Sequence, residues 1–154
     1  MFASAAAYRS ATSSSSATAF GNTSASAAGA YRQIGVETAA TDASPHRLIT
    51  LLFDGFTDAV AQASLAMQQG NFEAKGRFIG RSVNIVEQGL KGALDVKAGG
   101  ALAIDLRALY SYIALRLTQA NLHNDPRALE ECVRLMEPLR TAWVAIGPSA
   151  DGVQ

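Results

Sequence analysis

The segment from residue 101 to residue 122 constrains the fold most, because its apolar residues form two stripes instead of one. In the first stripe the residues recur at spacings of three and four, which places them on one face of an α-helix that packs against a core. The first stripe comprises Leu102, Leu106, Leu109, Ile113, Leu117 and Ala120. The second, on the roughly opposite face, comprises Ile104, Ala108, Tyr112, Leu115 and Leu122. One stripe is enough to pack a helix into a small bundle, so another part of the chain or a partner must cover the second.

Three other segments have the single apolar stripe of a bundle helix. We expect these helices at residues 44–70, 71–94 and 125–147. Ser44 and Asp125 each precede a proline, and a capping side chain followed by proline at the first helical position is typical of a helix start. The segment 95–100 is rich in turn-forming residues and predicts a loop. Pro138 predicts a kink in the last helix.

Composition divides the chain into four parts. Residues 1–29 are nearly all Ala, Ser, Thr and Gly, and such a tract buries too little apolar area to offset the entropy of ordering it. We therefore expect a disordered tail there, a short N-terminal cap segment at 30–43, a helical bundle at 44–147 and a flexible tail at 148–154. The predicted fold class is all-α: an antiparallel up-down four-helix bundle with a short extra N-terminal segment or helix.

Charge and cysteine content exclude several classes of protein. Thirteen basic and thirteen acidic residues give a net charge of zero, so the chain lacks the positive charge of a nucleic-acid-binding protein. No uninterrupted apolar run approaches the roughly 18 to 20 residues of a membrane span. The single cysteine, Cys132, lies beside Val133 and near Met136, which predicts a buried, reduced thiol. These features favour a soluble cytosolic protein.

Residues that could carry chemistry are few and poorly placed for it. The two histidines, His46 and His123, do not follow a glutamate by three residues, as a carboxylate-bridged metal site in a bundle requires. We expect His46 in solvent and His123 at a helix C-terminus. Asp54 and Asp58 are one turn apart, which is commoner on an exposed helix face than at a paired-carboxylate site. With no phosphate-binding loop and no Ser/His/Asp pattern, we expect no metal, no cofactor and no enzymatic activity.

The second predicted helix contains four glycines: Gly76, Gly80, Gly89 and Gly92. Each costs about 1 kcal/mol relative to alanine inside a helix. Two interpretations stay open. Either the helix is intrinsically weak and tertiary packing stabilises it, or the glycines let a partner backbone approach closely.

A set of short motifs runs through the chain from Tyr31 to Ile146. They are YRQ at 31–33, VETA at 36–39, ASPHRLI at 43–49, LFDG at 52–55, LD at 94–95, LYSY at 109–112, RL at 116–117 and LRTAW at 139–143. Each alone is common, but their order and spacing resemble the bacterial flagellar secretion chaperone family. The run 40–43 and the tail before Tyr31 are longer than in the family pattern. The family pattern therefore does not determine how the N-terminal segment docks on the bundle.

The resemblance implies a four- or five-helix antiparallel bundle without catalysis. It also implies a client, the disordered C-terminal region of flagellin, which becomes helical on binding and is kept from premature polymerisation. Family members also interact with the export gate protein at the membrane, and some are linked to an anti-sigma factor.

The resemblance also suggests which residues bind the partner. The N-terminal segment that covers part of the groove before the client arrives corresponds here to Tyr31, Ile34 and Val36. The groove wall corresponds to four residues of the second stripe: Ile104, Ala108, Tyr112 and Leu115. Tyr110 is expected at the boundary between core and groove.

The second stripe could also serve the chain without any client. Its residues could be ordinary core if the third helix were the central one. Alternatively, the stripe could form a permanent homodimer of a structural bundle that has no client. A small bundle enzyme or cofactor carrier is disfavoured by the missing ligands.

Overall fold

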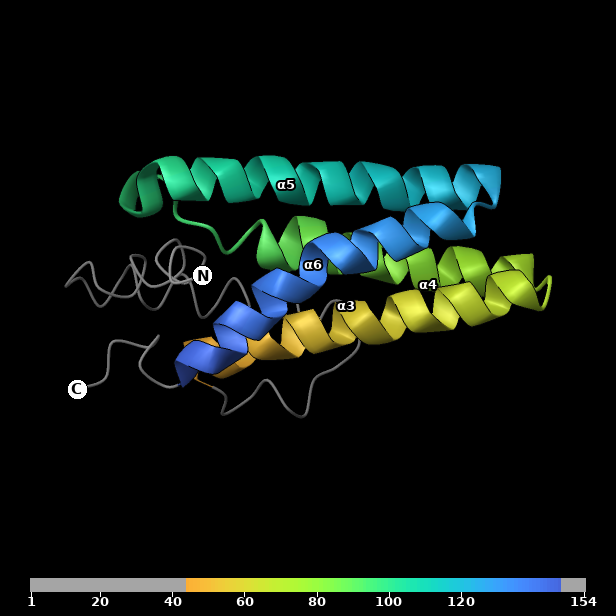
Figure 1. The fold of residues 1–154 in the computed structure, drawn as a ribbon, viewed down its shortest axis with the longest axis horizontal. Helices are drawn as coiled ribbons and strands as arrows, with labels where there is room; N and C mark the ends of the chain where they lie inside the picture. Colours follow the sequence, from red (N-terminus) through yellow and green to blue (C-terminus); the bar gives the residue numbers. More distant parts are fainter. Residues whose placement is uncertain (1–43, 148–154) are drawn as a thin grey trace.

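The computed structural model describes residues 44–147, which fold into long helices that run up and down the molecule in turn (Figure 1). They are α3 (Pro45–Gln68), α4 (Phe72–Asn84), α5 (Val96–His123) and α6 (Pro126–Ile146), and α4 continues into a π-helical segment, η1 (Ile85–Leu90). The predicted all-α antiparallel bundle is confirmed. The predicted tails and cap segment lie outside the described residues.

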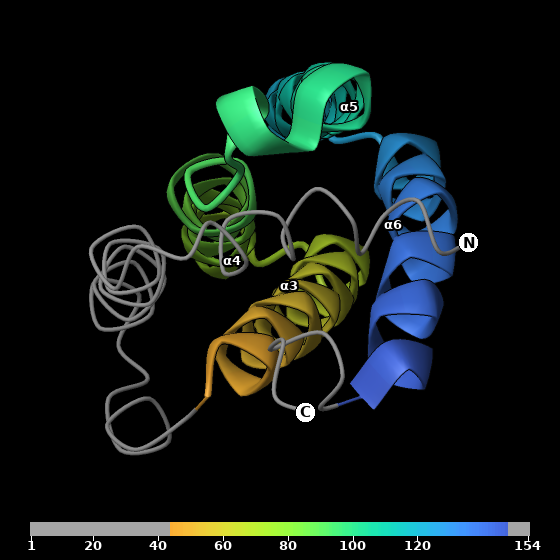
Figure 2. The same ribbon diagram turned by 90° about the vertical axis from the view of Figure 1, so that its left-hand side faces the viewer.

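The four helices form a ring in which each contacts its neighbours along the chain, and α3 also contacts α6. In the end-on view, α5 lies across the bundle from α3, with α4 and α6 on either side (Figure 2). The core lies between them and draws buried apolar side chains from every helix. A ring of this kind leaves each helix one face that no other helix covers.

Side-chain caps begin the helices where the sequence predicted them. Ser44 Oγ accepts a hydrogen bond from the Arg47 backbone N–H (3.1 Å), and Asn71 Oδ1 accepts one from the Ala74 N–H (3.1 Å). Asp125 precedes α6 in the same way. Each cap satisfies a backbone donor that the first helical turn leaves unpaired.

Two predicted boundaries are wrong. The segment 95–100 is not a loop: Asp95 caps a helical turn that starts at Val96, and this turn joins the rest of α5 through a kink at Gly100 (φ 59°, ψ −137°). Only glycine adopts such a conformation readily. The second helix is not α-helical to residue 94, since a wider π-helical turn begins at Ile85, with the Lys91 N–H bonded to the Val86 carbonyl (2.8 Å).

The prediction that His46 lies in solvent is wrong. Its ring stacks on Trp143 of α6, with 5.0 Å between ring centroids and an interplanar angle of 18°. The Trp143 Nε1–H donates to the His46 carbonyl oxygen (3.1 Å), and His46 Nε2 lies 2.9 Å from the Trp143 carbonyl oxygen. This reciprocal pair ties the start of α3 to the end of α6.

Helix α3 is long and apolar enough to cross a membrane by length and composition alone, with a mean hydropathy of 1.2. However, 56% of that window is buried inside the bundle. Leu52, Phe53 and Phe56 are among the largest fully buried side chains. This burial is typical of a helix that packs one face into the core of a bundle.

The packing around the glycines allows a matched pair of substitutions. A Cβ at Gly89 would lie 2.9 Å from Leu52 Cδ2 in the core, whereas a Cβ at Gly80 would meet no atom within 4 Å. We expect Gly89→Ala to lower the free energy of unfolding by about 1–3 kcal/mol through overpacking. Gly80→Ala should raise it by about 0.4–1 kcal/mol, because alanine restricts the unfolded chain. Urea unfolding of both variants measures this, and equal stabilisation by both would contradict the packing of η1 against α3.

The core also fixes the chemistry of Cys132. Burial raises the pKa of its thiol to about 12, and the nearby Glu131 carboxylate adds to the rise, with Arg116 opposing it. The native thiol therefore stays protonated at neutral pH, and we expect it to react with a disulfide reagent more than about 100-fold more slowly than the unfolded chain.

The same shift predicts how stability depends on pH. Because the unfolded thiol ionises at a lower pH than the folded one, its contribution to stability is complete below about pH 8.5 and is lost as the pH rises toward 12. Chemical unfolding of the native chain and of Cys132→Ala at pH 7 and pH 10 tests this. The gap between the two free energies of unfolding should narrow at pH 10, and an unchanged gap would show that the thiol is accessible to water.

Candidate partner-binding face

The second apolar stripe of α5 is exposed. The exposed fractions are 46% for Ile104, 41% for Tyr112, 53% for Leu115 and 75% for Leu122, and Ala108 is exposed as well. We call these five residues the outer face of α5. The interpretation of Ile104, Tyr112 and Leu115 as ordinary core residues is therefore wrong.

The outer face exists because the opposite stripe fills the core. Leu106, Ile113 and Leu117 are buried, with Ile113 and Leu117 fully so, while Leu102 and Leu109 are half-buried at the margin. Burying this stripe turns the outer face away from α3. From residue 104 to residue 122, at about 1.5 Å per residue, the outer face is about 27 Å long.

The prediction that Tyr110 lies at the boundary between core and groove is wrong, because its side chain is fully buried. Residues two apart on an α-helix point about 200° apart, so Tyr110 and Tyr112 lie on opposite faces. Tyr110 therefore belongs to the core and Tyr112 to the outer face.

The structure brings together the predicted residues of α5 but does not test the others. Ile104, Ala108, Tyr112 and Leu115 share one exposed face. Tyr31, Ile34 and Val36 lie outside the described residues. Their role as a cover for the groove stays a prediction.

A polar cluster borders the outer face on the side of α6. The Tyr112 hydroxyl donates to Glu131 Oε2 (2.5 Å), and Arg116 Nε donates to Glu131 Oε1 (2.8 Å). Arg116 Nη1 also donates to Gln119 Oε1 (2.7 Å). The sequence analysis did not identify Arg116 or Glu131 as site residues, since their pairing depends on how α5 and α6 lie side by side.

The hydrogen bonds of this cluster shift three pKa values in consistent directions. The bonds from Tyr112 and Arg116 lower the pKa of the Glu131 carboxyl, because both stabilise its charged form. The bond to Glu131 raises the pKa of the Tyr112 hydroxyl and that of the Arg116 guanidinium. At neutral pH the cluster therefore holds a neutral tyrosine, a carboxylate and a guanidinium.

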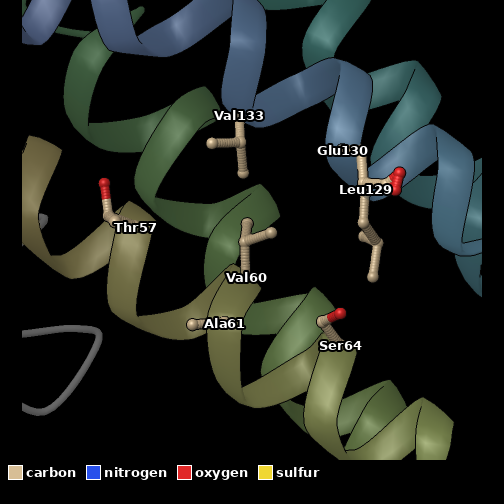
Figure 3. A pocket seen from close by; sticks show the side chains of 7 residues that line it. All are labelled: Thr57, Val60, Ala61, Ser64, Leu129, Glu130 and Val133. Atoms are coloured by element: carbon tan, nitrogen blue, oxygen red, sulfur yellow. The ribbon is translucent and has the colours of Figure 1, made fainter.

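A hollow that was not predicted from the sequence lies between α3 and α6. It has a volume of about 320 Å³. Figure 3 shows Val60 of α3 and Leu129 and Val133 of α6 directed into the space between the two helices. The other lining residues are Thr57, Ala61, Ser64 and Glu130. The small side chains Ala61 and Ser64 explain why the two helices leave this space.

The described residues offer little for metal or acid–base chemistry. Within 44–147, no three His, Cys, Asp or Glu side chains are grouped so that they could hold a metal ion. Asp54 is engaged in an ion pair with Arg140 of α6 (3.0 Å), and Asp58 is exposed.

Comparison with known proteins gives one consistent result. The family described as "Flagellar protein FliS" matches residues 27–150. The flagellar secretion chaperone FliS of Salmonella typhimurium is 46% identical over 121 residues, which cover 79% of this chain and 90% of that protein. The FliS of Escherichia coli is 47% identical over 114 residues (74% and 84%), and the FliSB of Pseudomonas aeruginosa is 40% identical over 116 residues (75% and 91%). The chain belongs to the FliS family of flagellar secretion chaperones.

Proposed function

We propose that this chain is a cytosolic export chaperone for flagellin. It binds the disordered C-terminal region of flagellin on the outer face of α5, blocks premature polymerisation and helps deliver the client to the flagellar export apparatus. Membership of a family of flagellar secretion chaperones supports the export role. The exposed apolar face supports the mode of binding.

The observation that carries the proposal is the exposed apolar row on α5. Ile104, Leu115 and Leu122 stay between 46% and 75% exposed, although the same helix already packs a full apolar stripe against the core on its other side. A row of this length matches the apolar stripe of a client helix laid along it, with contacts at every third or fourth residue. Such a client would also have its own self-association surface covered.

The disordered state of the client determines what the interface must supply. A segment that folds on binding loses conformational entropy, so the burial of apolar surface has to be extensive. One helix face is a narrow platform for this purpose. The hollow between α3 and α6 offers a second apolar area of the same molecule to a client that wraps around it.

The N-terminal cap segment has a place in this proposal. Tyr31, Ile34 and Val36 are the large apolar residues of this stretch, and they would shield the outer face until a client displaces them. Contacts with the export gate protein and with an anti-sigma factor are further expectations from the family resemblance.

Titration calorimetry with the C-terminal segment of flagellin from the same organism tests the proposal. We expect saturable one-to-one binding with a negative heat-capacity change, because apolar surface is buried. The absence of heat at several temperatures, with the chain folded, would overturn it. In that event, sedimentation that shows a dimer stable to dilution would favour the structural homodimer that pairs two outer faces.

Leu115→Asp tests the location of the interface. We expect binding of the flagellin segment to weaken more than about 100-fold, since a charge would have to be buried in an apolar contact. The helical circular dichroism should stay unchanged, because Leu115 is 53% exposed.

Leu65→Asp is the matched control for this substitution. Leu65 is a leucine with a similar exposed fraction, 49%, and it belongs to α3, which lies across the bundle from α5. Equal loss of binding in both variants would argue against a localised interface on α5.

A further inference from the structure

The two oxygens of one carboxylate on α6 hold two side chains of α5. Glu131 Oε2 accepts from the Tyr112 hydroxyl (2.5 Å) and Glu131 Oε1 accepts from Arg116 Nε (2.8 Å). Tyr112 and Arg116 are one turn apart on α5, so they lie next to each other along the edge of the outer face. Glu131 alone therefore holds both the Tyr112 and the Arg116 side chains in place.

The bond to Glu131 limits the rotation of a side chain that would otherwise be mobile. Tyr112 is 41% exposed, so packing alone does not hold its ring. A short bond from a hydroxyl to a carboxylate is stronger than a bond between neutral groups. The ring is therefore held toward α6 before any client arrives.

The cluster is not required to join α5 to α6. Fully buried apolar side chains of both helices, among them Leu117 of α5 and Leu129 and Cys132 of α6, belong to one core cluster that already joins the two helices. Partly exposed ion pairs contribute little to folding stability. The effect of the cluster is therefore on the shape of the surface.

We propose that Glu131 is a positioning residue for client recognition, and that Tyr112 and Arg116 are the side chains it holds ready to anchor the client helix. The proposal rests on the proposed function. Tyrosine and arginine are the residue types that, with tryptophan, most often dominate binding at protein interfaces. A side chain that is ordered beforehand loses less entropy on binding, which strengthens the complex.

The identity of the client's contact follows from the same geometry. Tyr112 presents its ring beside Ala108 and Leu115, while its hydroxyl is engaged with Glu131. The ring surface therefore suits an apolar client side chain. A client residue that needed the tyrosine hydroxyl as a donor would have to compete with a carboxylate.

A double-mutant cycle between Tyr112→Phe and Glu131→Ala tests the proposal, with calorimetric affinity for the flagellin segment as the readout. We expect Tyr112→Phe to raise Kd about 3- to 10-fold, the range of one hydrogen bond, and Glu131→Ala to raise it at least as much, because that change releases Arg116 as well. The double variant should lose little more than Glu131→Ala alone, because Tyr112→Phe releases a ring that Glu131→Ala has already released. Glu137→Ala is the matched control, since Glu137 is a half-buried carboxylate of the same helix that pairs with Arg140 of α6 and not with α5.

A second measurement follows Tyr112 without any client. Its ionisation is obtained as the difference between the ultraviolet titrations of the chain and of Tyr112→Phe. Removing the Glu131 carboxylate should lower the pKa of Tyr112, because the bond to Glu131 is the main cause of its raised value. Glu131→Gln provides the same test in a side chain of equal size if Glu131→Ala does not fold.

The outcomes separate this inference from the proposed function. If the native chain does not bind the flagellin segment, the proposed function fails and this inference fails with it. If the native chain binds but the Glu131 and Tyr112 variants bind equally well, only this inference is overturned. Fully additive losses would also overturn it, because they would mean that Glu131 acts on the client directly, and so would an unchanged Tyr112 titration.

Discussion

Burial of the inner stripe of α5 is the constraint on which the rest of the structure depends. A helix that buries Leu106, Ile113 and Leu117 has only one possible rotation about its axis. That rotation places the opposite stripe outside the bundle and brings Tyr112 and Arg116 within hydrogen-bonding distance of α6. The outer face of α5 is thus a consequence of the core, and no separate element is needed to form it.

The two stripes of α5 lie in different surroundings, since the inner stripe packs into the core and the outer stripe is exposed. Side chains of the inner stripe determine whether the bundle folds, and side chains of the outer stripe are available for binding. Tyr112 and Arg116 lie along the edge between the two stripes, since both side chains bond to Glu131 of α6. Because the outer residues are exposed, they can vary without loss of the fold.

Local patterns in the sequence predicted most of the fold. Ser44, Asn71 and Asp125 mark helix starts through caps that involve neighbouring residues only, and the α5 stripes follow from the helical period. The predictions failed where distant segments decide the outcome. His46 is held by Trp143 from the last helix, and the Glu131 cluster needs the packing of α5 on α6, so neither is visible in local spacing. The π-helical turn that begins at Ile85 contains Gly89, whose close approach to Leu52 of α3 is likewise a contact between distant segments.

The pairing of His46 with Trp143 gives the molecule a built-in optical probe. Trp143 is the single tryptophan of the chain, and its indole ring is buried against an imidazole at the junction of the first and last described helices. Its fluorescence therefore reports whether α3 and α6 are closed on each other. The outer face lies on α5, across the bundle from α3, so a ligand that occupies only that face leaves this emission unchanged, whereas one that opens the bundle alters it.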